Sequence, residues 1–178
     1  MPSKIRRVVT GHDAQGKSIV FDDRVLPEAT RVGIWFTGPG PSKNDDDRAL
    51  EFHPTKLEPP PGGSTLRINE AMPKQGGDSL SFAEKKQQAR QRFRSMDAEH
   101  CLVDSDRYAG MHRSKTTDYI LVLQGELTLI LDDGEAVLKA GDVVIQRGTS
   151  HAWENRGTAL ARWYVIMIDA ETHPHFRK

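Results

Sequence analysis

The sequence predicts an all-β protein, an antiparallel barrel or sandwich that carries one helix. Nine of its ten prolines lie at or before Pro73, and the tenth is Pro174. Because proline removes a backbone hydrogen-bond donor, the long proline-free stretch can form uninterrupted sheet. Apolar and polar residues alternate between Cys101 and Asp169, as half-buried strands require. Only one segment has the periodicity of a helix.

The N-terminal part predicts short strands on turns, followed by a long loop. Strands are expected at residues 5–9, 18–21, 31–37 and 64–70. Residues 38–63 are rich in proline and glycine and predict the loop, which is either functional or loosely ordered. The aspartates at 45–47 within it are expected to be solvated, because Lys43 and Arg48 flank them.

The single helix is expected at residues 82–96. Ser81 and Glu84 have the spacing of a capping box, in which each side chain bonds the backbone of the other residue. One helical face is apolar and basic residues surround it, which makes the helix amphipathic. The apolar residues are Phe82, Ala89, Phe93 and Met96.

The C-terminal part predicts the centre of the sheet. Strands are expected at residues 119–124, 127–131, 143–146 and 163–168. Asp133-Gly134 lies between apolar runs and is a strong hairpin signal. Several short strands at this spacing are typical of an all-β barrel or sandwich.

The composition argues against several classes of function and location. Lys plus Arg number 25 and Asp plus Glu number 25, so the chain lacks the basic excess of a dedicated nucleic-acid binder. Cys101 is the only cysteine, which fits a reducing compartment. The longest apolar run, Trp163–Ile168, is far shorter than the ~20 residues of a membrane helix. The basic N-terminus is not followed by the apolar stretch of a signal peptide. A cytoplasmic protein without nucleic-acid or membrane partners is therefore expected.

A set of polar residues shares one face of a predicted strand. His112, Ser114, Thr116 and Asp118 have the same parity and precede the apolar Ile120. Their face is therefore expected to point into the barrel. Because an unpaired buried carboxylate is costly, Asp118 needs a metal or a protonated histidine as its partner. His151, Trp153 and Asn155 share a parity in a second segment.

These two segments resemble the motifs of the cupins. The first motif, G-x5-H-x-H-x3,4-E-x6-G, is matched by His112 and by Asp118, which lies in the glutamate position before Gly125. The second motif, G-x5-P-x-G-x2-H-x3-N, is matched by Gly141, Gly148, His151 and Asn155. The close match covers residues 110–169.

The first motif is degenerate. Ser114 stands where the second histidine is expected, Asp118 is one methylene shorter than glutamate, and Asp106 stands in a glycine position. In the second motif Arg147-Gly148 replaces the proline turn. Many uncharacterised single-domain cupins (monocupins) look similar through these two segments, a resemblance that names no substrate.

The resemblance implies an antiparallel β-barrel of jelly-roll type. Residues 1–100 would supply N-terminal strands, the loop and the helix, packing on a barrel core at 101–169, with a tail at 170–178. His112, Asp118 and His151 would be the catalytic residues and the ligands of a divalent metal, Fe, Mn, Ni or Zn, since two imidazoles and a carboxylate suit such ions. In the alternative without metal, His112 and Asp118 pair internally.

The remaining candidates would bind substrate. Arg67 lies mid-strand between apolar residues and could grip a carboxylate with its guanidinium fork, or else lie on the surface. Ser114, Thr116, Trp153 and Asn155 are the other substrate-binding candidates, although Trp153 could equally be core. Tyr119, of opposite parity to Asp118, is expected to face outward. The other histidines, His12, His53, His100, His173 and His175, are weaker candidates.

Three functions remain open. The first is a metal-dependent enzyme, of decarboxylase, dehydratase, isomerase or dioxygenase type, acting on a small carboxylate or carbonyl compound. The second is a metal-free acid–base enzyme, a dehydratase, epimerase or cyclase. The third is a barrel that binds a ligand without changing it. The resemblance also implies a homodimer.

Overall fold

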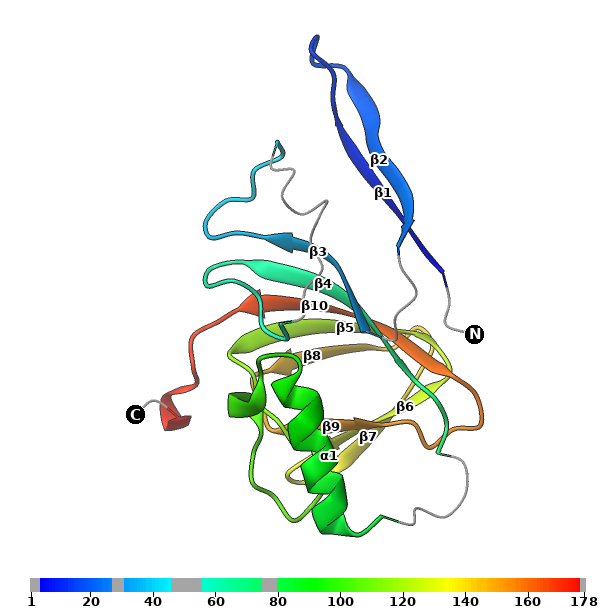
Figure 1. The fold of residues 1–178 in the computed structure, drawn as a ribbon, viewed down its shortest axis with the longest axis vertical. Helices are drawn as coiled ribbons and strands as arrows, with labels where there is room; N and C mark the ends of the chain where they lie inside the picture. Colours follow the sequence, from blue (N-terminus) through cyan, green and yellow to red (C-terminus); the bar gives the residue numbers. More distant parts are fainter. Residues whose placement is uncertain (1–3, 27–30, 46–55, 75–79, 177–178) are drawn as a thin grey trace.

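A computed structural model describes residues 4–26, 31–45, 56–74 and 80–176, which form three antiparallel sheets (Figure 1). A hairpin forms the first sheet, the second has the strand order β3-β4-β10-β5-β8, and the third has the order β7-β6-β9. The strands are β1 (Ile5–His12), β2 (Ser18–Leu26), β3 (Arg31–Thr37), β4 (Ser64–Ala71), β5 (Thr116–Gln124), β6 (Glu126–Leu131), β7 (Glu135–Lys139), β8 (Val143–Arg147), β9 (His151–Glu154) and β10 (Ala161–Asp169). The helices are α1 (Phe82–Arg94) and the short 3-10 turns η2 (Glu99–Cys101) and η3 (Pro174–Phe176).

The core lies between the five-stranded and the three-stranded sheets. Ile120 of β5 and Trp163, Val165 and Met167 of β10 pack in one buried cluster with Leu127 of β6. A neighbouring cluster joins β5, β6 and β7 through Val122, Leu129 and Leu138. The all-β architecture expected from the sequence is therefore confirmed.

Strand register fixes what faces the interior. Asp118 of β5 is opposite Met167 of β10, which is opposite Thr65 of β4. Two residues along, Arg67 of β4 is opposite Val165, which is opposite Ile120. Because side chains alternate along a strand, both rows point to the same inner face.

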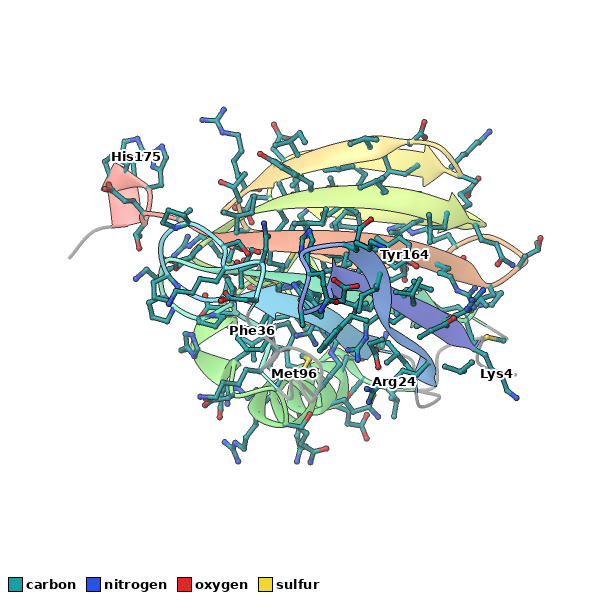
Figure 2. All side chains as sticks on the ribbon, turned by 90° about the horizontal axis from the view of Figure 1, so that it is seen from above. Lys4, Arg24, Phe36, Met96, Tyr164 and His175 are labelled. Atoms are coloured by element: carbon teal, nitrogen blue, oxygen red, sulfur yellow. The ribbon has the colours of Figure 1, made fainter. Side chains whose placement is uncertain are left out.

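The hairpin β1–β2 projects away from the barrel, at the top of Figure 1. Its base packs on the outer face of the large sheet, where Leu26, Ile34 and Ile68 form a cluster with Ile5 and Tyr164. Figure 2, in which Tyr164 is labelled, shows the same region from above. Several apolar residues further along the hairpin are exposed, namely Val8, Ile19, Val20, Phe21 and Val25.

Helix α1 packs on η2, and its Phe93 ring lies 4.8 Å from the ring of His112 (Figure 1). It starts with the expected capping box, since Ser81 Oγ accepts from the Glu84 amide and Glu84 Oε2 accepts from the Ser81 amide at 2.7 Å. Its buried residues are Ala89 and Phe93, and Phe93 packs with Ala98 and Cys101. The helix ends at Arg94, two residues earlier than expected, because the chain turns through Ser95 to a positive φ at Asp97.

The strands expected from periodicity are present, and two further strands were not expected. These are β7 and β9, which pair with opposite edges of β6. The Asp133-Gly134 signal is confirmed, because Gly134 has a φ of +83° in the turn that joins β6 to β7. Strands β3 and β4 belong to the main sheet, so residues 1–100 contribute to the barrel itself.

Asp46, Asp47, Arg48 and His53 lie outside the described residues. In the described part of the chain, no helix has the length and apolar character needed to cross a membrane.

Candidate active site in the barrel

A cavity of about 690 Å³ lies inside the barrel, between the five-stranded sheet, the three-stranded sheet and α1. Its volume falls in the range of roughly 300–1,000 Å³ that is typical of small-molecule sites. Among the described residues that line it, Asp118 is the one carboxylate. The cations that line it are Arg67, Lys74, Lys85, Arg92 and Arg107. Lys74 is paired with Glu154 and Arg107 lies 4.0 Å from Glu135, and the positive charge that remains suits a small anionic molecule.

A histidine pair forms one wall of the cavity. His112 and His151 form an isolated antiparallel bridge, in which each backbone amide donates to the other's carbonyl at 2.9 Å. The bridge brings their rings to a centroid distance of 4.2 Å with 45° between the planes. The Phe93 ring of α1 lies 4.8 Å from that of His112 at an angle of 57°, and Trp153 meets His151 edge-on. The two imidazoles are therefore held by backbone pairing and by aromatic packing.

His151 is buried and neutral at physiological pH. Burial lowers its pKa to about 4, because the imidazolium is disfavoured away from water, although a hydrogen bond to the Thr149 carbonyl opposes the shift. Its Nδ1 lies 2.9 Å from that carbonyl and 3.1 Å from Gln146 Nε2. Since these contacts all involve Nδ1, Nε2 is the nitrogen through which His151 can exchange a proton with a bound molecule.

Asp118 lies on the inner face of β5 and is 4% exposed. Burial raises its pKa to about 7 and the negative charge of Glu58 adds to the rise, whereas a hydrogen bond from Thr116 lowers it. Its Oδ1 has no hydrogen-bond partner in the described part of the chain. A carboxyl group that titrates near neutrality can both donate and accept a proton, so Asp118 is suited to acid–base chemistry.

Arg67 enters the cavity from β4 and is only 2% exposed. One guanidinium nitrogen, Nη1, donates to the backbone carbonyls of Lys56 and Leu57. Among the described residues, no carboxylate forms an ion pair with it, and burial lowers its pKa. A buried cation without a counter-charge is costly, so this is where an anion would be stabilised.

Comparison with known proteins identifies the family. A cupin-domain family model matches residues 100–167. Phomopsin biosynthesis cluster protein C' of Diaporthe leptostromiformis is 32% identical over 93% of this chain and 78% of its own length. This chain belongs to the cupin family. The cupin-domain-containing oxidoreductase fogC of Aspergillus ruber is 25% identical over 94% of this chain and 73% of its own length. Among solved structures, a Cupin 2 conserved barrel domain protein from Salinispora arenicola has a TM-score of 0.38 and 16% identity, covering 60% of this chain and 64% of that chain.

The other residues predicted to bind substrate in this cupin do not all line the cavity. Ser114 and Trp153 line the cavity. Thr116 is buried behind them, where its hydroxyl lies 2.6 Å from that of Ser114 and supports Asp118. Asn155 is not among the lining residues, because its amide is used in a turn. Its Nδ2 donates to the carbonyls of Ala71 and Ala159, and its Oδ1 accepts from Gly157.

Two residues near the site were not singled out from the sequence. Gln146 pairs with Asp118 across β8 and β5, is 3% exposed, and contacts His151 Nδ1. Glu58 acts on Asp118 through its charge. Neither residue could be assigned to the site from the sequence, because its position depends on how the strands pair. The shared parity of Gln146 and Val144 would have predicted only that Gln146 faces the interior.

His112, Asp118 and His151 would be the donors of a cupin metal site in the barrel. Two imidazoles and a carboxylate with an unpartnered buried oxygen have the right chemistry for a divalent metal. Within the described ranges, the one group whose donor atoms all lie within 4.8 Å of one another is Glu58, His100 and Cys101. His112, Asp118 and His151 do not form such a group in this structure, and their assignment as metal ligands stays a prediction. The structure offers a different group that could hold a metal.

Proposed function

We propose that this cupin is an enzyme that transfers protons on a small anionic compound bound inside the barrel. The observation that carries the proposal is Arg67, a buried guanidinium that faces the cavity with no carboxylate partner among the described residues. A carboxylate or an enolate oxygen of the substrate would supply the missing charge, and the guanidinium fork would orient it. Arg67 therefore supports a carboxylate- or carbonyl-bearing compound as the substrate.

Asp118 and the histidine pair would do the chemistry. With its pKa near 7, Asp118 is protonated in part of the molecules and ionised in the rest, so it can donate a proton or accept one. With its pKa lowered to about 4, His151 is a neutral and weakly basic imidazole that would hydrogen-bond the substrate at Nε2 and pass a proton on there. A base and an acid in one water-poor cavity support isomerisation, epimerisation or dehydration next to a carbonyl group. Ser114 and Trp153 would contact the substrate, and Gln146 would hold the His151 ring.

A metal-dependent reaction is the second candidate. The observation that favours it is Asp118 Oδ1, a buried carboxylate oxygen without a partner in the described residues. Relatives named cupin-domain-containing oxidoreductases, fogC among them, are consistent with redox chemistry in this family. A divalent ion on His112, Asp118 and His151 would polarise a substrate oxygen, once the side chains had moved closer together than they are here.

One experiment separates these functions. Small mono-, di- and keto-carboxylates are screened by thermal shift, and each compound that stabilises the protein is incubated with it and followed by NMR, with and without chelator. We expect conversion that survives chelation and falls at least 100-fold in His151→Gln and in Asp118→Asn, with His173→Gln as the control.

Each other outcome has a defined meaning. Conversion that is lost in chelator and restored by one added metal would replace the proposal with the metal-dependent candidate. Compounds that bind but emerge unchanged would overturn both enzyme functions and leave a ligand-binding barrel.

A further inference from the structure

Three metal-binding side chains converge outside the barrel cavity. Glu58 lies in the long loop between β3 and β4, while His100 and Cys101 are consecutive residues of η2. Their carboxylate oxygen, imidazole nitrogen and thiol sulfur all lie within 4.8 Å of one another. We propose that these three residues bind a zinc-type divalent cation. This inference does not rest on the proposed reaction, because none of the three residues lines the cavity in which that reaction is proposed.

The chemistry of the donors selects the ion. Sulfur and nitrogen ligands favour zinc and its neighbours in the transition series, whereas calcium and magnesium prefer all-oxygen sites. Glu58 Oε2 and His100 Nε2 are hydrogen-bonded at 2.8 Å, so a separation of about 3.3 Å, as between two tetrahedral ligands of one zinc ion, needs only a small shift. Three protein ligands leave the fourth tetrahedral position for water. The site would therefore resemble an exchangeable zinc site more than a closed structural one.

The protein holds the donors in place through backbone contacts. Glu58 Oε1 accepts a hydrogen bond from the Lys115 amide at 2.9 Å, which leaves Oε2 directed at His100. The Cys101 amide donates to the Ala98 carbonyl, and the Cys101 carbonyl accepts from the Arg113 amide. Such fixed outer contacts orient ligands in known metal sites.

A cation can reach the three donors from solvent, and the proton that it displaces can leave to water. His100 is 64% exposed at its side chain, so an ion can enter from solvent although Cys101 is buried. Burial and the charge of Glu58 raise the pKa of the Cys101 thiol to about 12, so the thiol keeps its proton when no cation is bound. Binding would form the metal–sulfur bond and release that proton to water.

The bound ion would also stabilise one wall of the cavity. Glu58 directly follows Lys56 and Leu57, whose carbonyls accept the hydrogen bonds of Arg67. The Leu57 amide donates to the Met96 carbonyl, and Leu57 itself lines the cavity. A cation that joins Glu58 to η2 would thus tie the segment that positions Arg67 to the end of α1.

Cobalt titration tests the site directly. The full-length protein, reduced and treated with chelator, is titrated with Co²⁺, and the thiolate-to-cobalt charge-transfer band is followed in the near ultraviolet. Since Cys101 is the only cysteine, any such band reports on this residue. We expect the band in the wild-type protein and displacement of cobalt by Zn²⁺. We also expect a band of full intensity in His151→Gln, which alters the barrel site alone.

Variants of the cluster decide the assignment. His100→Gln changes an exposed side chain, and Glu58→Gln keeps an oxygen for the Lys115 amide, so both are expected to fold. Each should weaken cobalt binding at least tenfold, and Cys101→Ala should abolish the band. Absence of the band from the wild-type protein at millimolar Co²⁺ would overturn the proposal. So would a cobalt affinity that neither His100→Gln nor Glu58→Gln reduces.

Discussion

Replacing Arg67 with methionine tests the central electrostatic argument. Methionine has a similar length and no charge, so it keeps most of the packing in the barrel wall. It removes the cation that we expect to bind the substrate anion. The change should therefore leave folding nearly intact and abolish anion binding, a combination that an ordinary structural arginine would not produce.

The expected magnitudes follow from the surroundings of Arg67. Burying an unpaired charge costs several kcal/mol, and Arg67→Met removes that cost. The variant also loses hydrogen bonds from a charged donor to the Lys56 and Leu57 carbonyls, at about 1.5–3 kcal/mol for a good bond. Because these contributions oppose each other, the free energy of unfolding should change by less than about 2 kcal/mol. Loss of a buried charge pair with a ligand costs about 2–5 kcal/mol, which lowers affinity roughly 30-fold or more.

Two measurements check the prediction together. Urea unfolding followed by tryptophan fluorescence gives the stability of both proteins, and calorimetric titration with the dicarboxylate that most stabilises the wild-type protein gives the affinities. Arg67→Lys is the matched control, since it keeps the charge but lacks the fork, and it should retain part of the affinity. Equal dicarboxylate affinity in Arg67→Met and wild type would refute the reasoning, as would a loss of stability above about 4 kcal/mol.

Three further predictions concern pH, a turn and assembly. Burial raises the pKa of Asp118 from 3.8 to about 7, so the folded protein retains a proton that the unfolded chain releases. The free energy of unfolding should therefore fall between about pH 4 and pH 7, by at most about 4 kcal/mol, and Asp118→Asn should flatten this dependence in urea titrations at several pH values. An unchanged slope would contradict the assignment. Asn155→Ala removes three hydrogen bonds and should reduce stability by about 2–3 kcal/mol. Calorimetry should show unchanged ligand affinity, and a weaker affinity would restore the substrate role expected from the sequence. Finally, we expect a homodimer that covers the exposed outer face at Leu121 and Val143, which pair across β5 and β8. Light scattering should show a dimer in the wild type and a monomer in Leu121→Lys, and a wild-type monomer would reject this interface.

Parity along the strands accounts for most of what could be predicted. The alternation of His112, Ser114, Thr116 and Asp118 placed these residues on one face, and the structure buries the last three. Tyr119, of opposite parity, is exposed on the outer face. The reason is that side-chain direction in a strand depends only on position along the chain, and the sequence records that position directly.

Pairing between strands could not be predicted in the same way. Gln146 joins the site because β8 lies beside β5 in a register that sets Gln146 opposite Asp118. The cupin motif suggests a substrate contact for Asn155, but its amide is committed to a turn that also fixes the end of β4. The metal-binding cluster joins Glu58 to His100 and Cys101, and 42 residues of sequence separate Glu58 from His100. No local sequence pattern predicts that these residues lie close together. Such contacts depend on the distances between segments, which a single sequence does not specify.

The register also explains why Arg67 and Asp118 do not neutralise each other. They lie on the same inner face, two strands and two residues apart, with β10 between their strands. At about 4.8 Å per strand and 3.3 Å per residue, their Cα atoms are roughly 12 Å apart. Val165 and Met167 lie between them and are apolar. Two opposite charges in a dry interior would gain from pairing. Because the sheet holds their strands apart, Arg67 and Asp118 stay unpaired with each other although both face the cavity.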